Sequence, residues 1–221
     1  VVVFDYGVAD ILKNLGVYAV VGLPKNGKMP EILSNYSDDK YTNVGSLKET
    51  DFEAVESLNP DLIIIGGRQA EDIDSFKEIA PTVNLAVDGQ DYMNSFKSVV
   101  TDLGNLFDKQ DEAKKAIDEI EAKIAKVNKT VTEKGLTASV VMANEGSISV
   151  FSAKSRYGLI YNGLGFTEAD KNIDDSTHGQ QVSFEYFLEN KSDYVFVVDR
   201  GAITGKGDSA SKLFDNEVMN K

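Results

Sequence analysis

The sequence predicts an α/β fold divided into two lobes. Three observations carry this prediction: short apolar runs alternate with amphipathic segments, a long helical stretch separates two such regions, and the two regions repeat each other. Alternation of short strands with helices is typical of parallel sheets covered by helices. With 221 residues, the chain is long enough to bury a substantial core.

The first lobe is expected to span residues 1–90. Its short apolar runs and breaks predict strands at Val1–Phe4, Val17–Val21, Leu62–Ile65 and Thr82–Ala86. Segments with helical periodicity lie between these strands, and we expect helices at Val8–Leu15, Phe52–Leu58 and Ile73–Ile79.

Residues 91–135 are expected to link the lobes through helices. A helical stretch at Tyr92–Phe107 is followed by Asp111–Glu133, which contains no Gly or Pro and is dense in Ala, Glu, Lys and Asp. Its apolar side chains recur at helical spacing from Ala113 to Val127. A flexible hinge would be rich in Gly and Ser, so the sequence predicts a long, rigid helix.

The second lobe is expected at residues 136–221. The same alternation predicts strands at Ser139–Met142, Ser147–Phe151 and Tyr194–Val198, and helices at Tyr157–Leu164 and Phe184–Leu188. Val1 opens directly on a buried-strand pattern, and Lys221 is not preceded by a closing strand. We therefore expect this lobe to be truncated at its C-terminus, and a leader or anchor to be absent from the chain.

The two lobes contain an internal repeat. A helix, a break, an apolar strand and an arginine follow one another from Phe52 to Arg68, and again from Phe184 to Arg200. The offset is a constant 132 residues, and it also pairs Glu53 with Glu185. Matching α/β units tied by one helix predict a pseudo-symmetric, bilobal protein.

The charge of the chain excludes several classes of partner. With 36 Asp and Glu against 23 Lys and Arg, the formal net charge is -13, which disfavours nucleic acid and anionic membrane surfaces. The chain has no cysteine, so disulfides, thiol nucleophiles and thiolate metal sites are excluded. Only three of the cations are arginines, and there is a single histidine, His178.

All three arginines are expected at the ends of strands. Arg68 and Arg200 follow the repeated apolar runs, and Arg156 follows the strand Ser147–Phe151 at the start of the next helix. Open α/β sheets bind ligands at the carboxyl ends of their strands, and helix N-termini favour anions. Lobes that face each other would bring Arg68 and Arg200 together, which predicts a cleft for an anionic ligand. Alternatively, each arginine pairs with a nearby aspartate such as Asp199 and only holds a loop.

His178, Glu53 and Glu185 each allow two interpretations. His178 lies in a polar stretch before the second-lobe helix, where it is either solvated or completes the coordination of a metal carried by a chelating ligand. Glu53 and Glu185 lie early in equivalent helices. They either stabilise the first helical turn or form one acidic contact per lobe for a basic partner.

Motifs that mark the common enzyme classes are absent from the sequence. There is no Gly-x-Ser-x-Gly elbow, no Walker loop, no dinucleotide fingerprint after a strand and no His-Glu-x-x-His. We therefore expect a binding protein and not an enzyme.

Seven segments together resemble the substrate-binding proteins of ABC iron–siderophore importers, in particular the catecholate subgroup of enterochelin and petrobactin binders. In chain order, they are VVVFDYG at 1–7, GLPK at 22–25, NVGSLKE at 43–49, NPDLIIIGGR at 59–68, SRYGLI at 155–160, HGQ at 178–180 and DYVFVVDR at 193–200. The similarity covers essentially the whole chain in the expected order.

The resemblance implies a class III fold, with two Rossmann-like lobes joined by a long helix and a ligand cleft between them. It implies that Arg68, Arg156 and Arg200 contact an anionic ferric catecholate, with Tyr157 as a further ligand contact. His178 matches a histidine that binds iron when the siderophore leaves coordination sites open. A tyrosine that supplies a second iron ligand in this subgroup would lie after Lys221.

The resemblance also implies the partners and the location. Glu53 and Glu185, one in each lobe, match the glutamates that dock on arginines of the ABC permease. The protein is expected to be monomeric and extracytoplasmic, either periplasmic or a cell-surface lipoprotein whose lipid anchor is absent from this chain. No permanent cofactor is expected, because the ferric siderophore is the transported ligand.

Three alternatives remain open. The ligand could instead be haem, cobalamin or a hydroxamate siderophore, although three arginines favour an anionic ligand over a neutral hydroxamate. A two-lobed α/β transferase would require a nucleotide motif that the sequence lacks. An adhesin or surface scaffold would need no ligand cleft.

Overall fold

The structure is a computed structural model that describes residues 1–204 and 209–216. Contacts within the chain divide it into two compact units, the first made of Val1–Val87 and Ser95–Ile117, the second of Asp88–Asn94 and Asp118–Lys221. The predicted division at residues 1–90, 91–135 and 136–221 stays a prediction. The remaining residues, 205–208 and 217–221, fall in the predicted second lobe and lie outside the described part.

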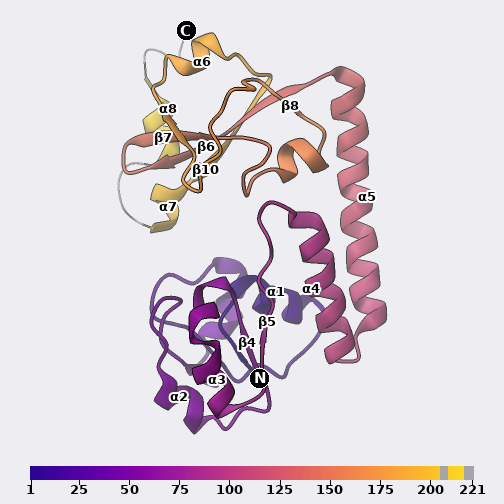
Figure 1. The fold of residues 1–221 in the computed structure, drawn as a ribbon, viewed down its shortest axis with the longest axis vertical. Helices are drawn as coiled ribbons and strands as arrows, with labels where there is room; N and C mark the ends of the chain where they lie inside the picture. The colour runs from indigo at the N-terminus through magenta and orange to yellow at the C-terminus, as the bar shows by residue number, and fades with distance from the viewer. Residues whose placement is uncertain (205–208, 217–221) are drawn as a thin grey trace. The chain divides into compact units, whose positions relative to one another are not determined.

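The first unit alternates short strands with helices, and Figure 1 shows its elements. They are β1 (Val2–Val3), α1 (Tyr6–Asn14), β2 (Gly22–Leu23), the 3-10 helix η1 (Glu31–Ser37), β3 (Thr42–Asn43), α2 (Phe52–Ser57), β4 (Ile63–Ile65), the 3-10 helix η2 (Gly67–Asp72), α3 (Ile73–Ile79), β5 (Thr82–Asn84), most of α4 (Tyr92–Leu106) and the start of α5 (Gln110–Lys134). The predicted long helix is therefore α5, which runs unbroken from the first unit into the second.

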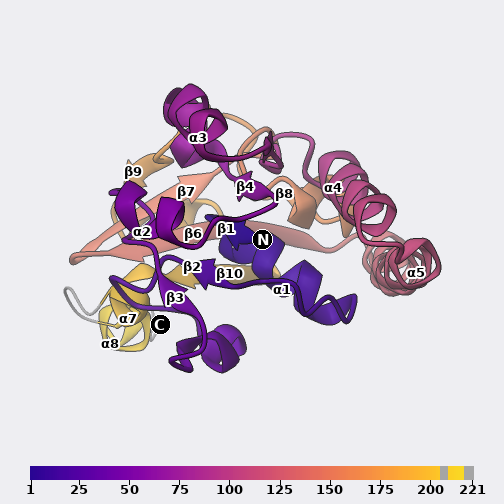
Figure 2. The same cartoon turned by 90° about the horizontal axis from the view of Figure 1, so that it is seen from below.

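The five strands of the first unit form one parallel sheet in the order β3-β2-β1-β4-β5. Successive side chains of a strand point to opposite faces, and both faces of this sheet are buried. Val3 and Ile64 pack with α1 and α4, whereas Val2 and Ile63 pack with α2 and α3. Figure 2 shows α1 and α2 on opposite sides of the sheet. The predicted α/β class is confirmed.

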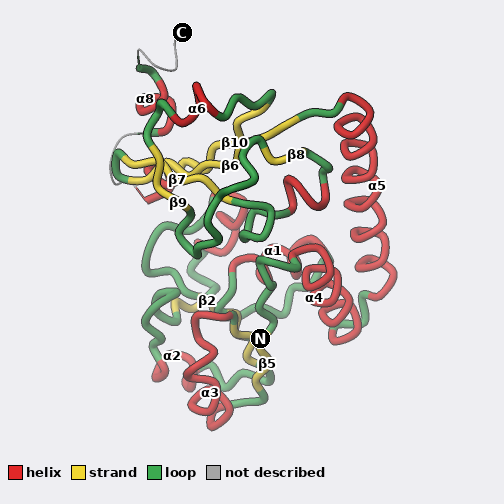
Figure 3. The backbone as a smooth tube through the Cα atoms, turned by 45° about the horizontal axis from the view of Figure 1, so that its top comes forward, coloured by secondary structure: helices red, strands yellow, loops and turns green. Residues whose placement is uncertain are grey.

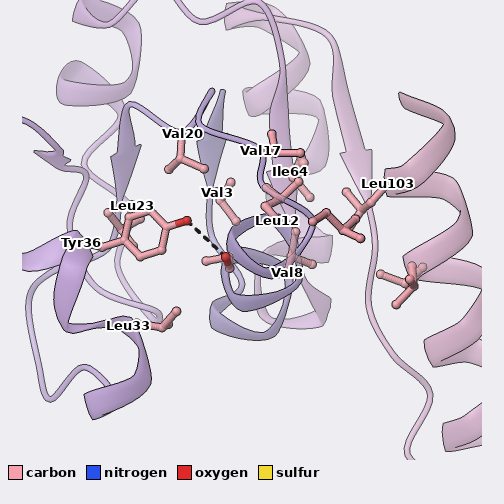
Figure 4. Packing of buried hydrophobic residues seen from close by; sticks show 14 of the residues in the cluster. Val3, Val8, Leu12, Val17, Val20, Leu23, Leu33, Tyr36, Ile64 and Leu103 are labelled. Atoms are coloured by element: carbon pink, nitrogen blue, oxygen red, sulfur yellow. Dashed lines mark hydrogen bonds between the residues drawn. The ribbon is translucent and has the colours of Figure 1, made fainter. Parts of the chain in front are cut away.

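The larger cluster of the first unit gathers around α1 (Figure 4). Val8 and Leu12 of α1 are buried against Val3 of the central strand. The Tyr36 hydroxyl donates a hydrogen bond of 3.2 Å to the Ala9 carbonyl, which ties η1 to the same helix. The helix begins at its cap Asp5, whose carboxylate accepts a 3.0 Å hydrogen bond from the Val8 amide.

The second unit contains a mixed sheet. Its elements after α5 are β6 (Thr137–Asn144), β7 (Ser147–Phe151), the π-helix η3 (Leu159–Gly163), β8 (Thr167–Glu168), β9 (Gln180–Val182), α6 (Tyr186–Glu189), β10 (Tyr194–Asp199), α7 (Arg200–Thr204) and α8 (Ala210–Phe214). The strand order is β10-β6-β7-β9, with β8 also paired to β6, and Figure 3 shows the four main strands side by side. The pair β6–β10 is parallel, and the pairs β6–β7 and β7–β9 are antiparallel.

The internal repeat predicted from the sequence is present in the structure. β4 pairs in parallel with β1, and β10 pairs in parallel with β6. Each strand leads into a short helix, and Arg68 and Arg200 lie in the first turn of η2 and α7. The two arginines therefore occupy equivalent places at the carboxyl ends of parallel strands.

The second strand of the first lobe is displaced from its predicted position. The prediction placed it at Val17–Val21, but the strand is β2, which begins at Gly22. A Cβ at Gly22 would lie 2.6 Å from the Leu58 side chain and 3.1 Å from that of Val44, so these side chains would have to shift to admit a larger residue. Because glycine is a poor strand former, the apolar pattern marked the preceding residues instead.

The hydrophobicity of the helices bears on membrane insertion. Among the described residues, no helix is both long and apolar enough to span a bilayer.

A buried tyrosine joins β6 to β7 in the second unit. The Tyr161 hydroxyl accepts a 3.1 Å hydrogen bond from the Val140 amide and donates one of 3.2 Å to the Phe151 carbonyl. Val140 and Phe151 are paired residues of the two strands, and both are buried. Burial raises the pKa of Tyr161 to about 12, so the hydroxyl keeps its proton at neutral pH.

Replacement of this hydroxyl is expected to destabilise the second unit. Tyr161→Phe removes two buried hydrogen bonds to the backbone, which costs about 1–3 kcal/mol in the free energy of unfolding. Urea unfolding followed by circular dichroism measures the loss. The matched control is Tyr18→Phe, because Tyr18 is 90% exposed and its change is expected to stay within about 0.5 kcal/mol. Equal unfolding free energies for the two variants would contradict the assigned role.

Candidate ligand-binding site

The second unit contains a pocket of about 340 Å³ that brings together three of the residues predicted from the sequence: Arg156, His178 and Arg200. Its other lining residues are Met142, Asn144, Glu145, Ser147, Ser149 and Gln181. Two guanidinium groups and an imidazole thus share one polar pocket, a composition suited to anionic oxygens and to a metal.

The floor of this pocket is one face of the sheet. Met142 of β6 is opposite Ser149 of β7, and Ser149 is opposite Gln181 of β9. Asn144 and Ser147 are also paired, and each lies two residues from its neighbour on the same strand, so these side chains share a face. The sequence prediction missed these lining residues, because cross-strand register is not visible in a single chain.

Arg200 is positioned by the end of β10. This strand is in register with β6 up to the pair of Asp199 and Ala143, so α7 begins beside the pocket floor. The Asp199 carboxylate accepts hydrogen bonds from the amides of Ala202, at 2.9 Å, and Ala210, at 2.7 Å. Asp199 thereby caps α7 and fixes the start of α8.

Arg156 is held by one hydrogen bond and two aromatic rings. Its Nη2 donates a 2.7 Å hydrogen bond to the Thr177 carbonyl. The guanidinium carbon lies 5.8 Å from the ring centre of Phe151 and 5.5 Å from that of Tyr157. These contacts limit the orientations that the guanidinium can adopt.

Tyr157 packs against Arg156 and Phe151. Its ring packs edge-on against Phe151, with centroids 4.8 Å apart, and it is partly buried against a hydrophobic cluster. Tyr157 is not among the residues that line the pocket. Its predicted direct contact with the ligand stays a prediction. In the structure, the Tyr157 ring contacts the Arg156 guanidinium.

His178 lies on an exposed loop between β8 and β9. The backbone amide of His178 donates a 3.2 Å hydrogen bond to Ser176 Oγ, and this hydroxyl donates one of 3.0 Å to the Gly179 carbonyl. Gly179 has a φ of +76°, and a Cβ there would lie 2.8 Å from the Phe151 ring. Glycine is therefore needed where the loop turns into β9.

Arg68 lines a separate pocket in the first unit. This pocket has a volume of about 290 Å³ and lies at the carboxyl ends of β1 and β4, where the strand order reverses. Gln69, next to Arg68, is buried and donates a 2.9 Å hydrogen bond from Nε2 to the Leu47 carbonyl. The strand-end position predicted for Arg68 is confirmed, and the pocket that holds Arg156 and Arg200 does not include it.

The two glutamates occupy equivalent exposed positions. Glu53 lies in the first turn of α2, after the cap Asp51, which accepts a 3.0 Å hydrogen bond from the Ala54 amide. Glu185 immediately precedes α6, and a hydrogen bond from Ser183 holds the pKa of its carboxyl below the usual range. Ser183 corresponds to Asp51 in the repeat, but it bonds to the glutamate itself, whereas Asp51 caps the helix.

Parallel strands that end at arginines, beside a polar pocket, are typical of a protein that binds a ligand at the edge of an α/β sheet. The sequence matches the periplasmic binding protein family over residues 1–221, and the chain belongs to that family. The family consists of substrate-binding proteins, so the expectation of a binding protein is confirmed and the transferase alternative is wrong.

Individual relatives support the predicted resemblance. The chain is 49% identical over 220 residues to the petrobactin-binding protein YclQ of Bacillus subtilis, covering 99% of this chain and 69% of YclQ. It is 32% identical to the ferric-anguibactin-binding protein FatB of Vibrio anguillarum, covering 92% of this chain and 64% of FatB. The chain thus spans about two thirds of the length of these relatives.

Solved structures show the same fold. The crystal structure of YclQ matches with a TM-score of 0.93 and 48% identity, covering all of this chain and 77% of that one. The periplasmic catecholate-siderophore binding protein VctP of Vibrio cholerae matches with a TM-score of 0.91 and 31% identity, covering 99% of this chain and 79% of that one. The two-lobed fold class predicted from the sequence is confirmed.

Proposed function

We propose that the chain captures a ferric catecholate-type siderophore outside the cytoplasm and delivers it to an ABC permease for iron uptake. The observation that carries the proposal is the convergence of Arg156, Arg200 and His178 in one pocket of the second unit. The names of the relatives support the ligand class, since YclQ is a petrobactin binder, FatB binds ferric anguibactin and VctP binds catecholate siderophores.

Electrostatics favour this ligand class. A ferric complex with catecholate oxygens carries excess negative charge, whereas the protein has a formal net charge of -13. Attraction must therefore come from local positive groups, and Arg156 and Arg200 supply them within one pocket. Guanidinium groups suit fixed recognition of several anionic oxygens, whereas a neutral hydroxamate complex would gain less from them.

In this proposal, iron is part of the transported ligand. Iron(III) is a hard cation that the catecholate oxygens hold, and an imidazole supplies one further donor. His178 is the candidate for that donor, and the protein needs no permanent cofactor. We propose a monomeric protein, either periplasmic or held at the cell surface by a lipid anchor.

Removal of either pocket arginine is expected to weaken binding of a ferric hexadentate tris-catecholate. Arg156→Ala and Arg200→Ala each remove charge-assisted hydrogen bonds worth about 1.5–3 kcal/mol, which corresponds to a loss of about 10- to 150-fold in affinity. Quenching of tyrosine fluorescence measures the affinity, because the chain has nine Tyr and no Trp.

Lys171→Ala is the matched control for the arginine series, since it removes one positive charge from the same unit outside the pocket lining. Its affinity is expected to stay near that of the wild type. Arg68→Ala is titrated in the same series, because Arg68 is the candidate ligand contact in the first unit. Wild-type affinity of Arg200→Ala would contradict the proposed role.

The His178 side chain is expected to bind iron only when the ligand leaves coordination positions open. A tetradentate bis-catecholate leaves two positions on an octahedral iron, so His178→Ala should shift the visible charge-transfer band of its bound ferric complex. The hexadentate complex serves as the control, because its iron has no open position and its band should be the same in both proteins. An unchanged tetradentate band would leave His178 as a solvated loop residue.

We also propose that Glu53 and Glu185 dock on basic residues of the permease. Both carboxylates are exposed at the start of helices that precede the repeated strands. In the full-length protein, Glu53→Ala and Glu185→Ala should reduce cellular uptake of the ferric complex while its affinity stays unchanged. The controls are Glu56→Ala on α2 and Glu189→Ala on α6, which are exposed on the same helices. Equal uptake by all four variants would refute the docking role.

A further inference from the structure

Two functional groups depend on a single exposed loop, residues 174–179. His178 lies on this loop, and its neighbour Thr177 supplies the carbonyl that accepts the 2.7 Å hydrogen bond from Arg156. The loop has no helix or strand of its own. The places of His178 and of the Arg156 guanidinium therefore depend on what fastens the loop to the body of the second unit.

Asp175 makes that connection. Its Oδ1 accepts a hydrogen bond from Ser152 Oγ, and its Oδ2 lies 3.3 Å from Lys154 Nζ. The Lys154 side chain is 81% exposed, and ion pairs in such surroundings contribute little. Ser152 is buried, so the hydrogen bond from its hydroxyl is the stronger anchor.

The anchor point on the protein body is itself fixed. Ser152 follows the last residue of β7. The Ser152 carbonyl accepts two hydrogen bonds from Ser155, one of 3.1 Å from its amide and one of 2.7 Å from its hydroxyl. Ser152 Oγ also accepts a 3.2 Å hydrogen bond from the Lys154 amide. The hydroxyl that meets Asp175 is thus held in a rigid turn at the end of a buried strand.

Hydrogen bonds within the loop couple the position of Asp175 to that of His178. Ser176 Oγ bonds to both the His178 amide and the Gly179 carbonyl, and the Asp174 amide donates a 2.8 Å hydrogen bond to Gln180 Oε1. Hydrogen bonds within the loop therefore connect its residues from Asp174 to Gln180. A displacement at Asp175 moves the residues that follow it, because they are tied to one another.

We propose that Asp175 is a positioning residue: by fastening the loop to Ser152, its carboxylate sets the positions of His178 and of the carbonyl that orients Arg156. This inference deepens the proposed function and rests on it, because its consequence for binding requires that the pocket takes a ferric catecholate. Groups that orient a metal ligand affect metal affinity without touching the metal.

The test compares ferric complexes of a tetradentate and a hexadentate catecholate. Asp175→Ala and Ser152→Ala are expected to weaken binding of the tetradentate complex about tenfold and to shift its charge-transfer band. The hexadentate complex needs no protein donor, so its affinity should fall less. Asp175→Asn keeps an oxygen that can accept from Ser152 and should retain most of the tetradentate affinity. Lys154→Ala leaves the bond to Ser152 intact and should bind the tetradentate complex nearly as well as the wild type.

Asp193→Ala is the matched control. Asp193 lies in the same unit outside the pocket lining, and its carboxylate accepts two hydrogen bonds of 2.8 Å, from the Thr137 amide and hydroxyl. Its loss is expected to lower the melting temperature without shifting the charge-transfer band. If Asp175→Ala behaves like Asp193→Ala, with an unchanged band and equal losses for both ligands, the positioning role is wrong.

Hydrogen–deuterium exchange without ligand separates this inference from the proposed function. The peptide that covers residues 174–179 should lose protection in Asp175→Ala and keep it in Asp193→Ala. Unchanged protection in Asp175→Ala would overturn the anchor, whatever the ligand. Failure of the wild-type protein to bind either ferric complex would overturn the proposed function, while loss of protection would still support the anchor.

Discussion

The pairing of β10 with β6 is the constraint on which the candidate site depends. Six consecutive residues of each strand are in parallel register, from Tyr194 with Ala138 to Asp199 with Ala143. This pairing delivers Arg200 to the end of β6, from which the hairpin to β7 begins. The pairing of β7 with β9 then brings in the chain that follows His178. Two ladders thus collect residues that are far apart in sequence into one pocket.

Preorganisation is the second feature of the pocket. Arg156 is held by the Thr177 carbonyl and by the rings of Phe151 and Tyr157, and Asp199 fixes the helix that begins with Arg200. A guanidinium that is already oriented loses less conformational freedom when an anion binds. In a protein of such strongly negative net charge, we expect the placement of a few cations to matter more for the choice of ligand than the total charge does.

The sequence predicted the parts of the site that local patterns mark. An apolar run followed by arginine identified Arg68 and Arg200 as strand-end residues, and the repeat made them equivalent. The pocket floor could not be predicted, because the pairing of Ser149 with Gln181 depends on tertiary register. The start of β2 was missed for a related reason: Gly22 packs closely against Leu58 and Val44, which no local propensity reports.

We propose that the pocket of the second unit binds the iron of a ferric catecholate. Anomalous diffraction at the iron absorption edge, from crystals of this chain with a bound ferric bis-catecholate, tests it most directly. We expect an iron peak in the pocket whose floor includes Ser149 and Gln181, at bonding distance from an imidazole nitrogen of His178, with catecholate oxygens against Arg156 and Arg200. An ordered iron peak outside this pocket, with no contact to these three side chains, would contradict the account.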